Sequence, residues 1–278
     1  QIRLPLTSIS LSAGSDKIEG SMAENERELR QQICEIGRLM YQKGWVAAND
    51  GNLSIRLNDD RYLCTPTNIS KGMMTHEDLI IVDGKGTKVE GRRERTSEIM
   101  MHLTIYGMRP DVGAVVHAHP PVSTGFAVSG RPLNQAILPE VVVMLGCVPL
   151  ADYGLPGTPA LSETIKPFIP KHDAILLGNH GAVCSGQHIW QAYFRMETLE
   201  HVARIALVAE MLGGPKLLPR AEVDKLFEAR GRYGITSHTT MESGCPITAE
   251  DTRGERITVT REELISLIEE AVAARTGR

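Results

Sequence analysis

The chain has 278 residues, enough for one large domain with a sizeable core or for two small ones. Its composition, 42% hydrophobic and 23% charged, is that of a soluble globular protein, and no apolar run approaches the length of a transmembrane helix. The formal net charge of −4 argues against a dedicated nucleic-acid binder, which normally carries a basic face. We therefore expect neither a membrane nor a nucleic acid among its partners.

The cysteines are scattered along the chain and form no CxxC pair. They are Cys34, Cys64, Cys147, Cys184 and Cys245. An odd number of cysteines without zinc-knuckle spacing predicts a reduced, cytoplasmic protein that has no disulfide framework.

The first 21 residues have no starting methionine and no continuous apolar segment, which argues against a signal peptide. Gly20-Ser21 directly before Met22 is typical of a cloning remnant. Residues 1–21 are therefore predicted to be an expression tag or a disordered arm, with Met22 as the native start.

Helices and strands are predicted to alternate in the first half of the chain. The first helix spans residues 24–43, where apolar residues recur at helical spacing, and Gly44 ends it. A second helix begins at Thr96 or Ser97, either of which can cap it, and ends at Arg109-Pro110. The strand-like segments between the two helices are 52–57, 61–65, 79–83 and 87–91.

The alternation continues in the second half. An apolar stretch at 140–146 is of uncertain type, and Gly178-Asn179-His180 joins two strand pieces within 173–186. The other predicted elements are a strand at 114–119 and helices at 120–130, 189–212 and 261–274. This order predicts an α/β fold in which helices cover a sheet, with one main domain at 22–235 and a C-terminal extension at 236–278.

The segment AVVHAH places two histidines one residue apart at the end of a predicted strand. His117 and His119 point to the same face of that strand, so one ion can reach both imidazoles. His180 follows another strand in LLGNHGAV, where Gly178 and Gly181 let the backbone bend. Zinc prefers such nitrogen ligands, and a catalytic zinc site supplies three of them and leaves one position open. The alternative is a pair of histidines that cap a strand end and a third in a tight turn.

Glu98, in RTSEIMMH, lies in the first turn of the second predicted helix. A carboxylate there is a fourth metal ligand, or an acid/base that acts once substrate has displaced it from the metal. The alternative is a glutamate that the helix dipole favours. His102, one turn later, is expected to pack against Glu98 or orient it rather than to bind metal.

Several polar residues are candidates for an anion pocket without a P-loop. Thr96 and Ser97 lie at a predicted helix N-terminus, where free backbone N–H groups and the helix dipole favour a phosphate. Turn formation and helix capping are the alternative roles. The candidate residues are Asn52, Thr67, Asn68, Thr96 and Ser97.

Together these motifs resemble the class II aldolase/adducin family, most closely its fuculose-1-phosphate aldolase branch, over residues 30–235. The resemblance implies a three-layer α/β/α fold with a central mixed, largely antiparallel sheet. The similar segments are GNLSIR, LCTPTNIS, EGRRERTSEIMMHLTIYGMRPDVGAVVHAHPP, GTPALSE and AILLGNHGAV, with a weaker match at FEARGRYGI.

The resemblance also implies roles for individual residues. The family's zinc ligands fall on His117, His119 and His180, with Mn²⁺ or Co²⁺ as alternative metals, and Glu98 matches an additional ligand that is also the catalytic acid/base. Tyr233 matches a catalytic tyrosine that a neighbouring subunit contributes, because the family is commonly a homotetramer with sites between subunits. The phosphate-binding positions fall on Asn52, Thr67, Asn68, Thr96 and Ser97. Two of these depart from the prototype: Asn68 replaces a glycine, which an asparagine can do at positive φ, and Thr96 replaces a serine.

The activity that the resemblance implies is cleavage of a phosphorylated ketose to dihydroxyacetone phosphate and an aldehyde. The prototype aldolase has a second catalytic tyrosine where this chain reads Leu138-Pro139-Glu140. Related methylthioribulose-phosphate dehydratases place a catalytic glutamate near Glu140, so a decarboxylase or dehydratase of a sugar phosphate or another acidic substrate is the alternative. A non-enzymatic, adducin-like interaction module is a third hypothesis, which the retained histidines and Glu98 disfavour.

Overall fold

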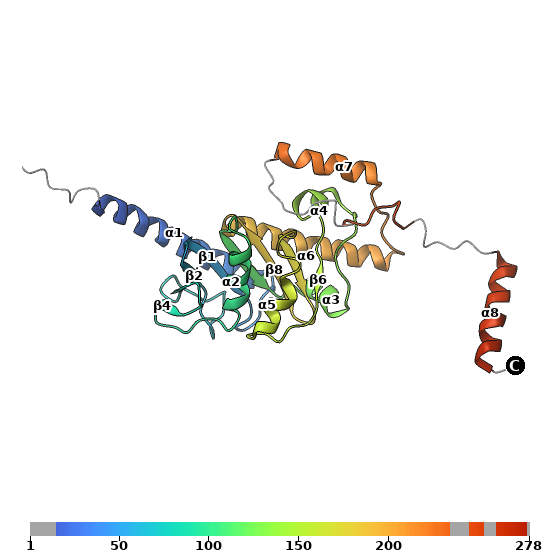
Figure 1. The fold of residues 1–278 in the computed structure, drawn as a ribbon, viewed down its shortest axis with the longest axis horizontal. Helices are drawn as coiled ribbons and strands as arrows, with labels where there is room; N and C mark the ends of the chain where they lie inside the picture. Colours follow the sequence, from blue (N-terminus) through green and yellow to red (C-terminus); the bar gives the residue numbers. More distant parts are fainter. Residues whose placement is uncertain (1–14, 234–244, 253–259, 277–278) are drawn as a thin grey trace, which may run out of the picture.

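The computed structural model describes residues 15–233, 245–252 and 260–276 (Figure 1). Within them, one eight-stranded sheet has the order β4-β3-β2-β1-β5-β8-β7-β6. Neighbouring strands are antiparallel except for β6 and β7, which are parallel, so the predicted mixed, largely antiparallel sheet is confirmed. The strands are β1 (Asn52–Asn58), β2 (Arg61–Cys64), β3 (Ile80–Val82), β4 (Lys88–Glu90), β5 (Ala114–Ala118), β6 (Leu150–Ala151), β7 (Ala174–Leu177) and β8 (Gly181–Gly186).

The helices lie on both faces of this sheet, which gives the predicted three layers (Figure 1). No helix within the described ranges combines the length and the apolar character that crossing a bilayer would require. The helices are α1 (Ser15–Gln42), α2 (Ile99–Met108), α3 (Pro121–Val128), α4 (Pro139–Met144), α5 (Pro159–Ile165), α6 (Ile189–Met211), α7 (Arg220–Ala229) and α8 (Arg261–Thr276), with a 3₁₀ helix η1 (Arg230–Tyr233).

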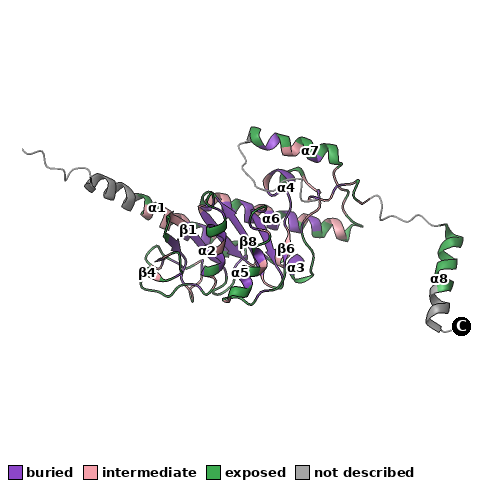
Figure 2. Ribbon diagram, in the orientation of Figure 1, coloured by how far each residue is buried: buried purple, intermediate pink, exposed green. Residues whose placement is uncertain are grey.

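Side-chain alternation along the central strands divides the core into two clusters. On β5, Val116 joins the cluster under α1, α3 and α6, whereas Val115 joins the cluster under α2 and α5. β8 follows the same rule, with Cys184 on the first face and Val183 on the second. Because successive residues of a strand point to opposite faces, both faces of the central strands are apolar and buried (Figure 2).

Several boundaries differ from the sequence-based expectation. Helix α1 begins at Ser15 rather than at residue 24. The sequence-based start was too late because it relied on apolar periodicity, which starts only near Leu29. Helix α2 begins at Ile99 rather than at Thr96 or Ser97, and its N-cap residue, Glu98, makes no capping hydrogen bond with its side chain. The stretch of uncertain type is helix α4, which has a proline in its first turn.

The expectation of a protein without disulfides is wrong, because Cys147 and Cys245 form one. Residues 133–136 lie between the two cysteines: Leu133 bridges Val148 on one side and Gln135 bridges Ile247 on the other. This pairing brings together cysteines that are 98 residues apart in the chain. Spacing along the sequence carries no signal of such a contact.

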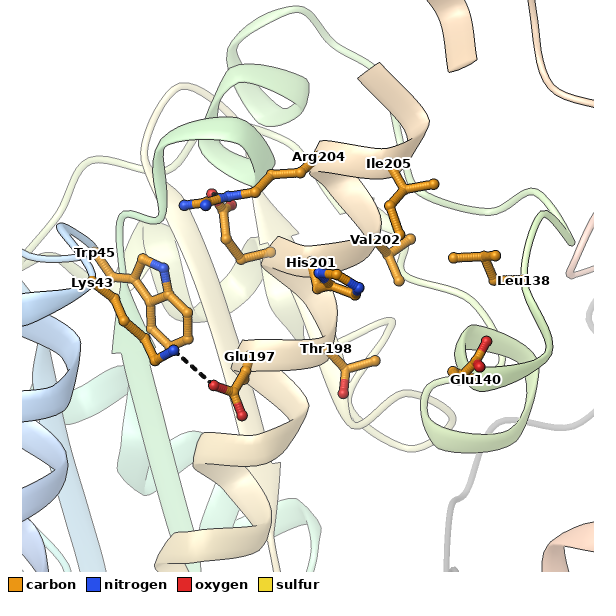
Figure 3. Close-up of a pocket in the computed structure, with 11 residues that line it drawn as sticks. Lys43, Trp45, Leu138, Glu140, Glu197, Thr198, His201, Val202, Arg204 and Ile205 are labelled. Carbon is orange, nitrogen blue, oxygen red and sulfur yellow. Dashed lines mark hydrogen bonds and ion pairs between the residues drawn. The ribbon is translucent and has the colours of Figure 1, made fainter. Parts of the chain in front are cut away.

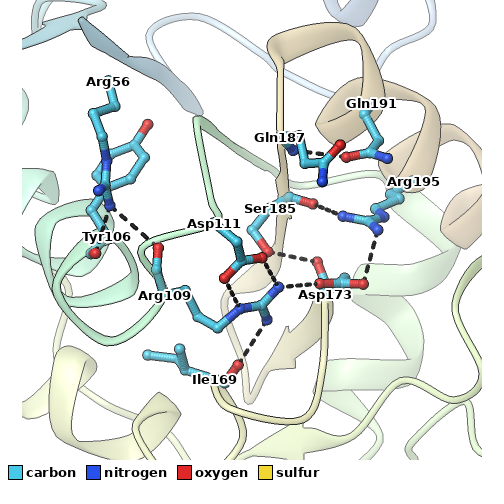
Figure 4. A network of polar contacts seen from close by, with 10 residues as sticks. All are labelled: Arg56, Tyr106, Arg109, Asp111, Ile169, Asp173, Ser185, Gln187, Gln191 and Arg195. Carbon is cyan, nitrogen blue, oxygen red and sulfur yellow. Dashed lines mark hydrogen bonds and ion pairs between the residues drawn. The ribbon is translucent and has the colours of Figure 1, made fainter. Parts of the chain in front are cut away.

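A buried charge network closes the end of β5, β7 and β8 opposite the histidines (Figure 4). The two carboxylate oxygens of Asp173 lie 3.0 Å from Arg109 Nη2 and 2.9 Å from Arg195 Nη2. Arg195 also donates to the Ser185 carbonyl at 2.6 Å. The Asp173 side chain has no solvent exposure, so the three charged groups depend on one another.

Asp173→Ala is expected to lower the free energy of unfolding by about 3–5 kcal/mol, because it leaves the buried Arg195 guanidinium without this carboxylate and Arg109 with Asp111 alone. Urea denaturation of the metal-loaded protein measures the change. Glu163→Ala, which breaks the exposed Glu163–Lys166 pair, should change stability by less than about 1 kcal/mol. Equal effects of the two substitutions would contradict this account of the network.

Candidate metal centre and active site

The three predicted histidines meet at the end of two central strands. His117 lies on β5, opposite Asn52 of β1 and Val183 of β8 in the sheet register. His119 follows β5, and its backbone N–H donates to the Trp45 carbonyl at 2.9 Å. His180 lies in the turn between β7 and β8. One ligand nitrogen from each imidazole lies within 4.8 Å of the others, which is the spacing of a metal site.

The hydrogen bonds of the imidazoles leave lone pairs that face one another. His117 Nδ1 lies 2.9 Å from the Ala182 carbonyl, which only accepts, so the proton is on Nδ1 and Nε2 carries a lone pair. His119 Nδ1 faces Asp50 at 3.5 Å, which leaves His119 Nε2 at 3.2 Å from His117 Nε2. Converging lone pairs repel each other unless a cation lies between them. Three converging imidazole nitrogens are the donor set that zinc prefers, so these residues fit the expected metal. The other ring nitrogens of His117 and His119 face a carbonyl and a carboxylate, whereas His180 Nδ1 is buried and has no hydrogen-bond partner among the described residues.

The turn that carries His180 depends on close backbone packing. The residue with positive φ is Asn179, at 52°, rather than either predicted glycine. Gly181 serves close approach instead: a Cβ there would lie 2.5 Å from His119 Cδ2 and 2.6 Å from the Ala118 carbonyl. Any side chain at residue 181 would therefore push His119 out of the cluster.

Glu98 lies at the edge of the histidine cluster. Its Oε1 lies 3.1 Å from His180 Nε2 and its Oε2 lies 3.4 Å from His117 Nε2. Burial acts to raise the pKa of Glu98, but the charges and hydrogen bonds of His117 and His180, in the protonated state that these imidazoles can adopt without a metal, outweigh it and hold that pKa well below its usual range. The carboxylate is therefore ionised, and it can ligate a metal or accept a proton.

A chain of buried hydrogen bonds holds Glu98 from behind. Asn52 Nδ2 donates to Glu98 Oε2 at 2.7 Å, and Asn52 Oδ1 lies 2.5 Å from His102 Nε2. His102 Nδ1 lies 2.7 Å from Ser54 Oγ, which lies 2.8 Å from the Tyr106 hydroxyl. His102 thus orients Asn52, and Asn52 orients Glu98, so the expected orienting role of His102 acts through one intermediate residue.

Burial, with a smaller contribution from the charge of His117, lowers the pKa of His102 to about 3. The ring is therefore neutral near pH 7, with one N–H. Since Asn52 Oδ1 only accepts, that proton is on Nε2, and Nδ1 accepts from Ser54. Each group in this series of hydrogen bonds then donates to the next one, from Tyr106 to Glu98. The final donor, Asn52, therefore favours a negatively charged Glu98 carboxylate.

The candidate anion-binding residues lie on loops that pair with one another. The Thr67 N–H donates to the Glu94 carbonyl at 3.0 Å, and Pro66 forms a bridge with Arg95, so the loop after β2 lies beside the segment before α2. Asn68 has the expected positive φ, 56°. Thr96 Oγ1 accepts from Asn52 Nδ2 at 3.4 Å and from the Glu98 N–H at 3.3 Å. Ser97 beside it is exposed.

The structure places one of the two remaining predicted catalytic residues, Glu140, away from the histidine cluster. Within the described residues, Glu140 makes no hydrogen bond or ion pair to a histidine; it is exposed on α4. It lines a cavity of about 580 Å³ against α6, with Lys43 and Trp45 on the other side (Figure 3). Tyr233 ends η1, and its side chain lies outside the part of the chain that the structure describes.

Some residues of the site had not been singled out from the sequence. Ser54 and Tyr106 extend the hydrogen-bond chain, Asp50 faces His119, and Lys71 is a buried residue of the loop that carries Thr67. One signal was present: Ser54 lies two residues after Asn52 in NLSIRL, so the two polar side chains share a face of a buried strand.

His102→Leu is expected to reduce kcat by about 10–100-fold, because Asn52 loses the partner that orients it against Glu98. It should also lower the free energy of unfolding by about 1–3 kcal/mol, because buried polar groups lose their partners. Tyr106→Phe removes only the far end of the same chain and should have the smaller effect on kcat. Steady-state kinetics decide, and wild-type turnover in both variants would contradict the orienting role.

The fold and the cluster define a class of protein: a three-layer α/β/α protein whose histidines and glutamate can hold a catalytic metal at the ends of central strands. The model of the class II aldolase and adducin N-terminal domain family matches residues 31–207, and the chain belongs to this family.

Curated relatives carry two kinds of name. The L-fuculose phosphate aldolase of Methanococcus maripaludis is 35% identical over 181 residues, 65% of this chain and 97% of that protein. The 3-oxo-tetronate 4-phosphate decarboxylase of Escherichia coli (strain CFT073) is 32% identical over 190 residues, 67% of this chain and 89% of that protein. The chain is thus similar to lyases of two reaction types.

Solved structures have the same fold. An L-fuculose 1-phosphate aldolase superposes with a TM-score of 0.68 at 29% identity, over 72% of this chain and 95% of that chain. The L-fuculose-1-phosphate aldolase of Thermus thermophilus superposes with a TM-score of 0.60 at 28% identity, over 66% of this chain and 95% of that chain.

Proposed function

We propose that the protein is a zinc-dependent lyase that cleaves a phosphorylated ketose to dihydroxyacetone phosphate and an aldehyde. The observation that carries the proposal is the position of the Glu98 carboxylate, 3.1–3.4 Å from two of three imidazoles whose ligand atoms converge. Bound zinc, or Mn²⁺ or Co²⁺ in its place, supplies a Lewis acid that polarises the substrate carbonyl.

The protein's own groups bind the substrate and move its protons. Glu98 transfers the proton at carbon, and Asn52 holds the carboxylate in position for it. Thr67, Asn68, Thr96 and Ser97 bind the phosphate next to the metal centre. This assignment is supported by the pairing of their two loops and by the hydrogen bond between Asn52 and Thr96.

The remaining parts of the proposal concern assembly and location. The active unit is a homotetramer in which Tyr233 of a neighbouring subunit handles the proton on the departing aldehyde oxygen. The tetramer is located in the cytoplasm. The Cys147–Cys245 disulfide is the observation that speaks against this location, because such bonds are rare in cytosolic proteins.

A decarboxylase is the second candidate, and two observations favour it. The region Leu138-Pro139-Glu140 has no tyrosine to match the second catalytic tyrosine of the prototype aldolase, and the 3-oxo-tetronate 4-phosphate decarboxylase of Escherichia coli is 32% identical. Glu140 would then act as an acid/base from the cavity beside α6. A dehydratase uses the same two carboxylates without breaking the carbon skeleton.

Product analysis separates these reactions. The metal-loaded protein is incubated with a panel of ketose 1-phosphates and with a 3-oxo-tetronate 4-phosphate. The proposal predicts dihydroxyacetone phosphate and an aldehyde from one of the ketose phosphates. Release of carbon dioxide from the acid would instead assign the decarboxylase, and a product that has only lost water would assign the dehydratase. No turnover of any substrate by fully metal-loaded protein would favour an adducin-like interaction module.

A further inference from the structure

Lys71 is a buried lysine whose ammonium has no carboxylate partner. Its exposed fraction is 1%, and it lies on the loop between β2 and β3 that also carries Thr67 and Asn68. Its Nζ donates to two backbone carbonyls, those of Asn49 at 3.0 Å and Ile69 at 2.9 Å. Among the residues that the structure describes, no carboxylate lies within ion-pair distance of this nitrogen.

Helix α1 covers the backbone of this lysine. A Cβ at Gly37 would lie 2.8 Å from the Lys71 carbonyl oxygen and 3.4 Å from Lys71 Cβ, so the loop packs directly on the helix. Burying a charge that has no opposite charge beside it is costly. Burial lowers the pKa of Lys71 to about 8 despite the opposing charges of Asp50 and Glu98, so most of the population is still charged at pH 7.

The position of the ammonium connects the two halves of the site. Asn49 precedes Asp50, which faces His119 of the metal cluster. Ile69 follows Asn68 in the loop to which the anion pocket is assigned. An ammonium has three N–H groups, and the two carbonyls take two of them. One N–H therefore has no acceptor, and the positive charge has no carboxylate within ion-pair distance, among the residues that the structure describes.

We propose that Lys71 supplies the positive charge that pairs with the anionic group of the substrate, a phosphate or a similar oxyanion. The inference rests on the proposed function, because it places that group in the pocket of Thr67, Asn68, Thr96 and Ser97. Lys71 is a binding residue that also joins the turn of Asp50 to this pocket. The substrate's own charge then offsets the cost of burying an ammonium, which explains why the site has no internal partner for it.

The test measures binding of inorganic phosphate to the metal-loaded protein by calorimetry. Lys71→Gln keeps N–H donors for the two carbonyls and removes the charge, and Lys71→Met removes both. Both variants should bind phosphate at least tenfold more weakly, with unchanged metal content. In the absence of phosphate, the melting temperature of Lys71→Gln should be no lower than that of the wild type, whereas Lys71→Met should melt lower because it leaves two carbonyls without a donor. The matched control is Lys88→Met, which replaces a lysine of β4 that pairs with Glu94. This variant should bind phosphate as the wild type does.

Thr67→Val separates the two ideas, because it weakens the pocket without touching the lysine. If Thr67→Val weakens phosphate binding and Lys71→Gln does not, the pocket stands and the role of Lys71 is refuted. If Lys71→Met loses affinity and Lys71→Gln regains it, the lysine only braces two carbonyls, which also overturns the inference. If the wild type itself binds no phosphate, the proposed pocket fails before any variant is compared, and the role of Lys71 fails with it.

Discussion

His119→Ala is expected to lose the bound metal and to reduce kcat by at least about 10³-fold. The substitution removes one of three converging nitrogens, and the two that are left cannot hold a catalytic zinc in an ordered geometry. Burial and the charges of His117 and His180 lower the pKa of His119 to about 4. Its ring is therefore unprotonated at neutral pH, as a metal ligand must be.

The matched control is His76→Ala, which removes an exposed histidine that lies 4.0 Å from Glu77 on the loop between β2 and β3. Elemental analysis and steady-state kinetics of both variants decide the question. His76→Ala should retain its metal and its turnover. Wild-type activity of His119→Ala with no bound metal would show that the cluster is not the catalytic centre.

Glu98→Gln is expected to retain much of the zinc and to lose about 10²–10⁴-fold in kcat, the usual size of an acid/base contribution. The amide is nearly isosteric with the carboxylate, so Asn52 and the two imidazoles keep a polar neighbour. The three histidines still bind the metal. What the variant lacks is the group that accepts and returns a proton.

Glu140→Gln is the comparison for Glu98→Gln, because Glu140 is the other candidate acid/base and lies on the cavity beside α6. The aldolase assignment predicts a small effect of Glu140→Gln, well below that of Glu98→Gln, measured as kcat on the same substrate. Normal turnover of Glu98→Gln together with an inactive Glu140→Gln would reverse the two roles and favour the dehydratase-like chemistry.

The histidine cluster could be predicted because short-range rules place its residues. The period of two along a strand puts His117 and His119 on one face, and a turn after an apolar strand brings His180 to a strand end. The alternation of helices and apolar strands was sufficient for the α/β class, whereas the three layers and the largely antiparallel sheet followed from the family resemblance. The place of each histidine at a strand end depends on residues near it in the sequence, whereas the meeting of His180 with His117, which the family resemblance implied, depends on the pairing of β5 with β8.

Features that depend on long-range register could not be predicted. Ser54 meets His102 and Tyr106 only because α2 crosses the face of β1, about 50 residues away along the chain. The Cys147–Cys245 bond depends on residues 133–136 lying between two distant segments. Lys71 in SKG has the pattern of an exposed turn lysine, and its burial follows from the packing of α1 over it.

The most direct test of the central claim is the metal dependence of cleavage. The purified protein is stripped with a chelator, and release of dihydroxyacetone phosphate from its best ketose 1-phosphate is measured before and after stoichiometric zinc is returned. The account predicts that activity is lost with the metal and restored by about one zinc ion per chain. Unchanged cleavage by fully stripped protein would contradict the assignment of His117, His119 and His180 to a catalytic metal.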